Sequence, residues 1–194
     1  MHSNSNRAWW QVAVMAVLLP ACAQAQERIA VCVHPDAVVN GLTLAQAEQV
    51  TARLFTDAGI RITWCHGHPA GDAISIEFSE HTPNGYRPGS MAFARPYEGV
   101  HITVFFDRIR ARSSAALTPT VLGYVLAHEM THILQRIDRH SDSGLMKAHW
   151  TNADLDQMAA KRLTFSAEDV ELIQRGLASQ ALRASNDQAP AGTL

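Results

Sequence analysis

The sequence predicts one α+β domain: a mixed twisted sheet with a backing helix, a long central helix and a small helical C-terminal part. A chain of 194 residues, 47% hydrophobic and 18% charged, suits a single domain with its own core. One strand pattern, one helix pattern and four further strand patterns follow in order, which indicates a mixed sheet carrying a helix. A net charge of −2 gives no electrostatic reason to expect nucleic acid or an anionic membrane as a partner.

Residues 1–25 have the pattern of a signal peptide. Arg7 provides the positive charge, and the following apolar stretch AWWQVAVMAVLLP is too short for a stable membrane span. Ala23-Gln24-Ala25 gives a small-x-small cleavage site. A lipoprotein signal with Cys22 lipidated is the alternative, although Pro20 fits that pattern poorly. We therefore expect an exported protein, periplasmic or secreted, with no stable membrane span after cleavage.

The first half of the expected domain is rich in strand patterns. The stretch AISIEFS alternates apolar and polar residues, as a half-buried strand does. Thr43 and Gln46 form a capping-box pattern that opens a helix, and Gly59 is a natural stop for it. Strands are expected at residues 28–33, 60–65, 73–79, 91–95 and 101–106.

The second half is expected to be helical. The central helix begins near Thr118-Pro119, where proline suits the first turn, and ARSSAALTP before it has loop character. A later helix is opened by Ser166, with Asp169 at the capping-box position. We expect the domain to cover residues 26–180 and residues 181–194 to form a disordered tail. The expected helices are residues 119–136, 152–161 and 166–179.

Signal cleavage would leave two cysteines, Cys32 and Cys65, in an oxidising compartment. An even pair there predicts a disulfide, with two free buried thiols as the alternative. Such a bridge would stabilise the fold by roughly 3–4 kcal/mol in the chain-entropy model.

Residues 128–132 read HEMTH, inside the pattern of the central helix. On a helix, His128 and His132 project about 40° apart and one turn apart, so both imidazoles can reach one ion. Glu129 lies beside the first ligand, where a base is needed that is close to a zinc-bound water without being a ligand. The spacing therefore predicts a Zn²⁺ site with Glu129 as its general base.

The third ligand must come from downstream. In an unbroken helix, Asp138 would lie about 280° around from His128 and face away from the metal. Some zincins use an aspartate at this spacing, but they resemble this chain only in part, because a glycine three residues after their second histidine turns the chain. Here that residue is Gln135, for which the left-handed conformation costs roughly 1 kcal/mol or more. His140 follows in polar, flexible sequence that can fold back, so the sequence favours His140. The other candidates are His149, Asp156 and Glu168.

These residues resemble the metzincin branch of zinc peptidases, whose motif is HExxHxxGxxH followed by a turn with a methionine beneath the metal. Here HEMTH is followed by His140-Ser141 and then by Ser143-Gly144-Leu145-Met146, so the resemblance implies that Met146 is the Met-turn residue. The chain looks most like exported bacterial proteins of metzincin type that carry HExxHxLL, then HSxxGIM and a nearby tryptophan, here Trp150. It departs from the family motif at Gln135 and in the late third histidine, so the helix must end differently.

The sequence thus predicts an exported zinc-dependent metalloendopeptidase that hydrolyses peptide bonds by a zinc-bound water activated by Glu129, with His128, His132 and His140 as ligands. Peptides or proteins are the expected substrates, bound in extended form along residues 91–95 by strand addition. The alternatives are a gluzincin-like peptidase with an acidic third ligand and a non-catalytic zinc-binding module.

Other residues offer less specific chemistry. His66 and His68 in CHGH can be read as a second metal site or as a solvated loop, and His149 as a neighbour of the site or a surface residue. Tyr86 and Tyr97, in loops beside the expected edge strand, are candidates for stabilising an oxyanion.

Overall fold

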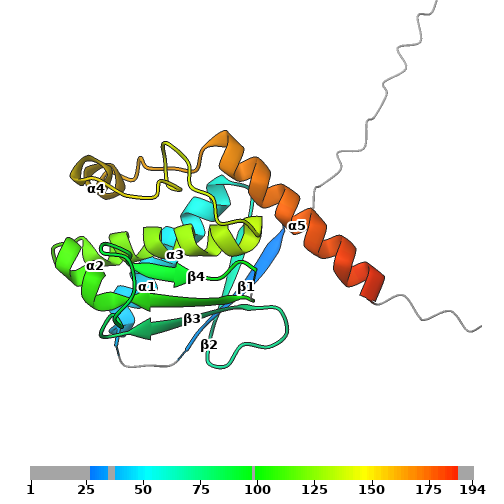
Figure 1. The fold of residues 1–194 in the computed structure, drawn as a ribbon, viewed down its shortest axis with the longest axis horizontal. Helices are drawn as coiled ribbons and strands as arrows, with labels where there is room; N and C mark the ends of the chain where they lie inside the picture. Colours follow the sequence, from blue (N-terminus) through cyan, green and yellow to red (C-terminus); the bar gives the residue numbers. More distant parts are fainter. Residues whose placement is uncertain (1–26, 35–37, 98, 188–194) are drawn as a thin grey trace, which may run out of the picture.

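The computed structural model describes residues 27–34, 38–97 and 99–187. The predicted signal peptide and the last residues of the predicted tail lie outside this part of the chain. The described residues form one sheet, helices that lie along it, and a C-terminal helix, α5, whose C-terminal end extends beyond the rest (Figure 1).

The sheet has five strands in the order β2-β1-β3-β5-β4. β1, β2, β3 and β5 are parallel, and β4 pairs antiparallel with β5 at one edge. The predicted mixed sheet is confirmed, including the short strand within residues 91–95. The strands are β1 (Arg28–Val33), β2 (Arg61–His66), β3 (Ile74–Ser79), β4 (Ala92–Ala94) and β5 (His101–Phe105).

One face of the sheet contributes to the core. Successive side chains of a strand point to opposite faces, so apolar residues two apart gather on the same side. The most deeply buried of these residues in the three central strands are Val31, Val33, Ile74, Ile76, Ile102 and Val104, each no more than 2% exposed.

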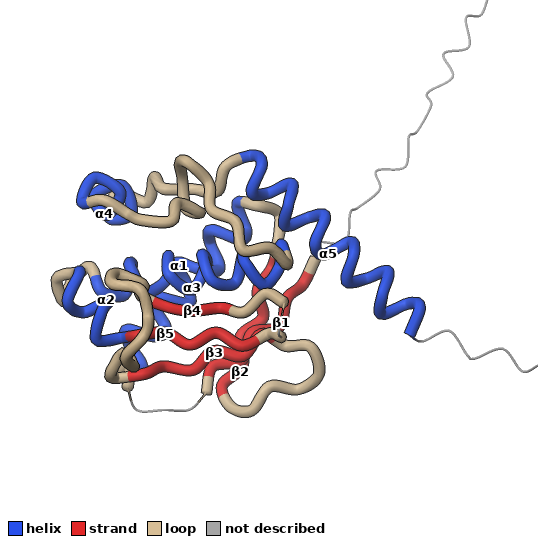
Figure 2. Tube along the Cα trace, viewed as in Figure 1, coloured by secondary structure: helices blue, strands red, loops and turns tan. Residues whose placement is uncertain are grey.

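Helices α1 (Gly41–Asp57) and α3 (Thr118–Gln135) pack against each other on this side of the sheet (Figure 2). Their contact is close at Gly123, where an added Cβ would lie 2.6 Å from the Cβ of Val50. The predicted capping box of the first helix is wrong. The N-cap is Asn40, whose side chain accepts a hydrogen bond from the backbone N–H of Thr43.

A seven-residue helix, α2 (Phe106–Arg112), begins directly after β5, where the sequence predicted the end of a strand and then a loop. No side chain caps its N-terminus. Phe106 and Ile109 are buried one turn apart, so packing rather than a capping signal defines this helix.

The C-terminal part consists of α4 (Asn152–Ala159) and α5 (Ala167–Asp187). The predicted capping box before α5 is present, because the side chain of Asp169 accepts from Ser166 and the Ser166 hydroxyl accepts from the backbone N–H of Asp169. The helix runs on to Asp187, so residues 181–187 are helical and not part of a disordered tail.

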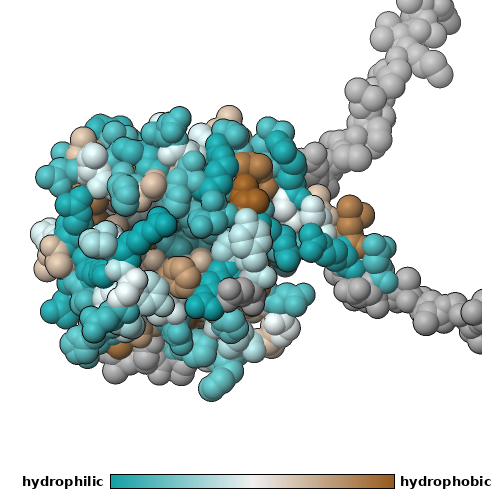
Figure 3. Space-filling model, in the orientation of Figure 1, coloured by the Kyte–Doolittle hydropathy of each residue, from teal (hydrophilic) through white to brown (hydrophobic). Residues whose placement is uncertain are grey.

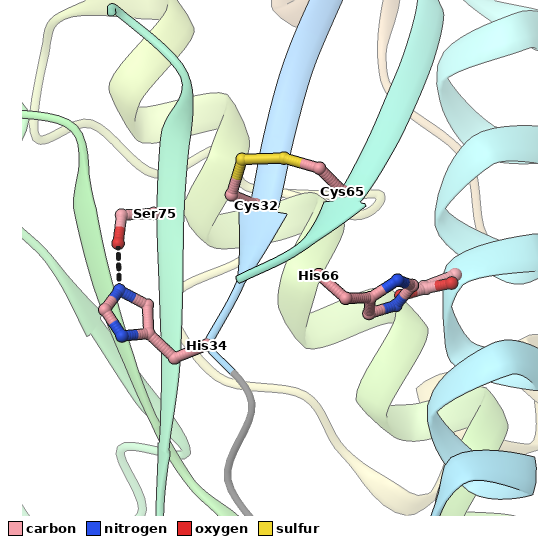
Figure 4. Close-up of a disulfide and its surroundings, with 6 residues drawn as sticks. Cys32, His34, Cys65, His66 and Ser75 are labelled. Atoms are coloured by element: carbon pink, nitrogen blue, oxygen red, sulfur yellow. Dashed lines mark hydrogen bonds and ion pairs between the residues drawn. A yellow bond between two sulfur atoms is a disulfide. The ribbon is translucent and has the colours of Figure 1, made fainter. Parts of the chain in front are cut away.

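Cys32 and Cys65 form the predicted disulfide (Figure 4). They are directly opposite each other on the paired strands β1 and β2, with their Cα atoms 4.5 Å apart. Val31 and Val33 belong to the core, so the alternation of the strand places Cys32 on the opposite face of the sheet. The bridge therefore fastens the edge strand β2 to its neighbour.

The surface shown in Figure 3 is mostly hydrophilic, with hydrophobic residues in small separate patches. None of the helices in the described ranges has the length and apolar character needed to span a membrane.

Candidate metal centre

Helix α3 carries the predicted metal-binding motif in its last two turns. The helix is buried along nearly its whole length, and His128 and His132 are only 8% and 5% exposed. Their Nε2 atoms are 3.1 Å apart, so the two rings converge on one point. The helical spacing that predicted this convergence is confirmed.

Each of these two rings forms a hydrogen bond to a backbone carbonyl through its other nitrogen, Nδ1. The Nδ1 atom of His128 lies 3.1 Å from the carbonyl oxygen of Leu145, and that of His132 lies 3.2 Å from the carbonyl oxygen of Ile137. A carbonyl oxygen can only accept, so each Nδ1 must carry the proton. In a neutral ring this leaves the lone pair on Nε2.

The environment keeps these imidazoles neutral. Burial, together with the neighbouring His132, lowers the pKa of His128 to about 3. Burial and the neighbouring His140 also lower the pKa of His132. Two neutral rings of the same tautomer thus face each other through their Nε2 lone pairs, an arrangement that a cation between them would stabilise.

The chain turns sharply after α3. The helix ends at Gln135, and Arg136 takes the left-handed conformation with φ 56° and ψ 31°. This turn carries the carbonyl of Ile137 back to His132. The left-handed conformation that was expected to be costly at Gln135 occurs one residue later, at Arg136.

The turn brings His140 to the other two histidines. One ligand atom from each of His128, His132 and His140 lies within 4.8 Å of the others, and the three could hold a metal ion. The ring centroid of His140 is 5.3 Å from that of His128 and 4.9 Å from that of His132. His140 is exposed, so the cluster opens to solvent on this side.

Glu129 lies between the helix and the edge strand. It is half-buried, and burial raises the pKa of its carboxyl to about 8. A backbone hydrogen bond from Ala94 in β4 acts in the opposite direction, and the negative charge of Asp138 raises the pKa further. A cation bound at the histidines would favour the ionised carboxylate.

The segment expected to contain the Met-turn is tightly held. The N–H of Ser141 donates to the carbonyl of Met146 (2.8 Å), and the N–H of Leu145 donates to the carbonyl of Thr164 (2.9 Å). Gly144 has a φ of 75°, a conformation that favours glycine. Met146 is fully buried. The segment thus fixes the Leu145 carbonyl that orients His128.

The other candidate ligands do not belong to the cluster. The carboxylate of Asp138 acts electrostatically on His132 and His140 without joining them, and Glu168 forms an ion pair with Arg139 (2.6 Å). Asp156 is exposed on α4, and His149 is exposed. Among the described residues, the metal-binding cluster consists of the three histidines without any of these four.

The remaining sequence candidates have structural partners. His66 pairs with Glu48 (2.8 Å) and lies on the other side of the disulfide from His34, which bonds to Ser75 (Figure 4). His68 contacts the ring of His34, with centroids 5.9 Å apart.

Tyr86 lies in an aromatic cluster on the sheet. Its ring is 5.4 Å from that of Phe93 and 4.6 Å from that of Phe105, and it lines a pocket of about 310 Å³. Tyr97 contacts the segment that leads to His140, through the N–H of Asp138. Stabilisation of an oxyanion by either tyrosine stays a prediction.

Several groups at the site have no signal in the sequence. The carbonyls of Ile137 and Leu145 hold the histidines, and the backbone of Ala94 contacts Glu129. Backbone groups have the same chemistry at every position, so only the fold selects them. Trp150 also belongs to the site, since its ring centroid lies 5.4 Å from that of His128. Its position soon after the HSDSGLM segment was the available signal.

No family model and no curated protein sequence matches the chain. Among solved structures, archaemetzincin from Methanopyrus kandleri is similar over 81% of this chain and 99% of that chain, with a TM-score of 0.58 and 14% sequence identity. This likeness confirms the predicted fold class, a zincin-like arrangement of a mixed sheet and helices.

Proposed function

We propose that the chain is an exported zinc-dependent endopeptidase, with His128, His132 and His140 as metal ligands and Glu129 as general base. The fold shared with archaemetzincin supports a zinc peptidase. The Cys32–Cys65 disulfide is compatible with an oxidising compartment and so with export.

The observation that carries the metal site is the 3.1 Å separation of two Nε2 atoms whose lone pairs face each other. At this distance the two lone pairs repel each other unless a cation lies between them. Tetrahedral zinc with Zn–N bonds of 2.0–2.1 Å places two nitrogens roughly 3.4 Å apart. The histidine set therefore fits zinc, and His140 supplies a third nitrogen on the exposed side.

The protein groups divide the work of hydrolysis. A zinc ion held by the three histidines would lower the pKa of a bound water and would polarise the scissile carbonyl. Glu129 accepts a proton from the attacking water and delivers it to the leaving amine. The Leu145 and Ile137 carbonyls keep the Nδ1 protons of the histidines in place, and Ala94 fixes the Glu129 carboxylate next to the edge strand.

The edge of β4 offers a place for an extended peptide. The N–H of Phe105 donates to the carbonyl of Met91, which places the hydrogen-bonded pairs at Met91 and Phe93. The polar backbone groups of Ala92 and Ala94 therefore point to the free edge. Ala94 contacts Glu129, so a peptide that adds to this edge would pass the general base.

The presence of Glu129 favours catalysis over a purely structural zinc site. A structural site has four protein ligands and needs no base, whereas the cluster here has three histidines with a carboxylate beside them. The gluzincin-like alternative requires an acidic third ligand from residues 152–161 or near Glu168, but the cluster among the described residues contains no carboxylate, and Glu168 pairs with Arg139.

The test measures bound zinc and peptide hydrolysis in the full chain and three variants. The parent is expected to bind one equivalent of zinc and cleave an unfolded protein substrate. Glu129→Gln should keep the zinc and lose activity by at least about 100-fold, as the removal of a general base does. His140→Ala should lose zinc affinity.

His149→Ala is the matched control, because His149 is an exposed histidine near His140 but outside the cluster. This variant should retain both zinc binding and peptide hydrolysis. Full activity in Glu129→Gln would exclude the proposed mechanism, and zinc binding without any hydrolysis in the parent would favour the non-catalytic module.

A further inference from the structure

We propose that Trp150 is a positioning residue for the metal-binding histidines, acting on His128 through a shared carbonyl oxygen and through ring contact. This inference rests on the proposed metal site. The indole N–H of Trp150 donates to the carbonyl oxygen of Leu145 at 3.1 Å. The Nδ1–H of His128 donates to the same oxygen, also at 3.1 Å.

The Leu145 carbonyl is the element that the two side chains share. A carbonyl oxygen has two lone pairs, and here one serves each donor. Leu145 is fully buried, and its N–H, which belongs to the preceding peptide unit, is bound to the carbonyl of Thr164. The hydrogen bond from Trp150 acts on the following peptide unit and restrains rotation of the carbonyl away from His128.

The ring of Trp150 adds a second restraint. Its centroid lies 5.4 Å from that of His128, with the planes 85° apart, an edge-to-face contact. The imidazole is thus held at Nδ1 by a hydrogen bond and against tilting by the indole. Both restraints keep Nε2 directed toward the other histidines.

Trp150 is itself anchored from outside the site. Its backbone carbonyl accepts a hydrogen bond from Arg112 in α2 at 2.8 Å. The next residue, Thr151, is the N-cap of α4 and forms a capping box with Asp154. The position of the indole is therefore set by two helices that carry no ligand, and Trp150 transmits that position to His128.

Removing the indole N–H should weaken metal binding without removing a ligand. The Leu145 carbonyl would keep its hydrogen bond from His128, but nothing from Trp150 would then restrain the orientation of that carbonyl. One lost hydrogen bond corresponds to a weakening of zinc affinity by roughly 3- to 10-fold. The replacement of choice is Trp150→Phe, which retains an aromatic ring and lacks only the donor and part of the ring area.

Trp64→Phe is the matched control. Trp64 lies in β2 and its indole nitrogen has no hydrogen-bond partner among the described residues, so the substitution removes no such bond. Zinc affinity of the full chain and both variants is measured by competition with a chromophoric chelator. We expect the parent and Trp64→Phe to agree and Trp150→Phe to bind 3- to 10-fold more weakly.

A second measurement is made first on the parent, in which Trp150 is in place, and then uses the two variants to identify the tryptophan that is quenched. Co²⁺ bound at the histidines should quench the fluorescence of a tryptophan that contacts a ligand. Quenching should persist in Trp64→Phe and be largely lost in Trp150→Phe. Trp9 and Trp10 are common to all these proteins and cancel in the comparison.

The outcomes separate this inference from the proposed function. If the parent binds zinc and Trp150→Phe binds it with the same affinity, the positioning role is wrong while the zinc site stands. Quenching that is lost in Trp64→Phe instead would also exclude it. If the parent binds no zinc, the proposed function itself is wrong.

Discussion

Arg136 takes the left-handed backbone conformation at the end of α3, with φ 56°. A residue with a Cβ is destabilised there by roughly 1–2 kcal/mol relative to its ordinary conformation. The turn remains because local contacts compensate: the N–H of Arg136 donates to the carbonyl of Ile133, and the carbonyl of Ile137 meets His132. The strain at this residue is part of what orients a candidate ligand.

Arg136→Gly should therefore stabilise the protein by about 0.5–1 kcal/mol, since glycine relieves the strain but gives the unfolded chain more entropy. Urea denaturation measures the effect. Arg136→Ala removes the same side chain but keeps a Cβ, so it should not share the gain. Equal stability of the two variants would contradict this explanation of the turn.

The N-terminal half of helix α5 packs against the C-terminal end of α3. Gln135 donates from its side-chain amide to the carbonyl of Asp169 (3.1 Å), which lies in the first turn of α5. Further along, Gly176 packs directly on the backbone of α3, where an added Cβ would overlap the carbonyl oxygen of Leu134. Gln135, at the position where the metzincin motif has a glycine, thus joins the two helices and does not turn the chain.

Gly176→Ala tests this contact. In an exposed helix the change would stabilise by about 1 kcal/mol through helix propensity. Here the new methyl group would overlap rigid backbone, so the substitution should instead lower the free energy of unfolding by at least about 2 kcal/mol. Thermal and urea unfolding measure it, with the exposed Ser185→Ala in the same helix as the control. A stabilised Gly176→Ala would show that α5 does not pack on α3 in this way.

Not all elements were equally visible in the sequence. Strands with strict alternation, such as β3, and the long helix α3 have strong periodic patterns, and both were predicted. The short helix α2 was missed, because a single buried turn through Phe106 and Ile109 is too brief to show a period. The cap of α1 was misplaced because Asn40 and Thr43 are both good N-cap residues, and only their contact shows which one caps the start of the helix.

The molecule has two different sheet edges. At one edge, β4 faces the candidate metal centre, and at the other, β2 is joined to β1 by the Cys32–Cys65 disulfide. The bridge spans 33 residues of sequence, which include the whole of α1. It therefore constrains the unfolded chain over a long loop while lying at the edge of the sheet away from the histidines.

The double variant Cys32→Ala/Cys65→Ala should lose about 3–4 kcal/mol of stability relative to the oxidised parent, because its unfolded chain regains loop entropy. Urea denaturation measures this, and reduction of the parent by dithiothreitol should have a similar effect. Zinc affinity should stay at the parent value under conditions where the variant is folded. An unchanged denaturation midpoint would show that the bridge contributes nothing to stability.

The sequence by itself determined the fold class, most of the elements, the disulfide pair and the convergence of His128 and His132. These follow from short-range rules, because the spacing of residues within a helix or strand fixes the faces they share. It also favoured His140 for the third position. Only the tertiary structure decided how His140 reaches the other two histidines. The chain turns at the left-handed Arg136, and α5 packs against the end of α3. The same holds for the contacts of Glu129 with Ala94 and of Trp150 with Leu145. These contacts join residues on separate elements, where position depends on packing of the whole chain and no local pattern records it.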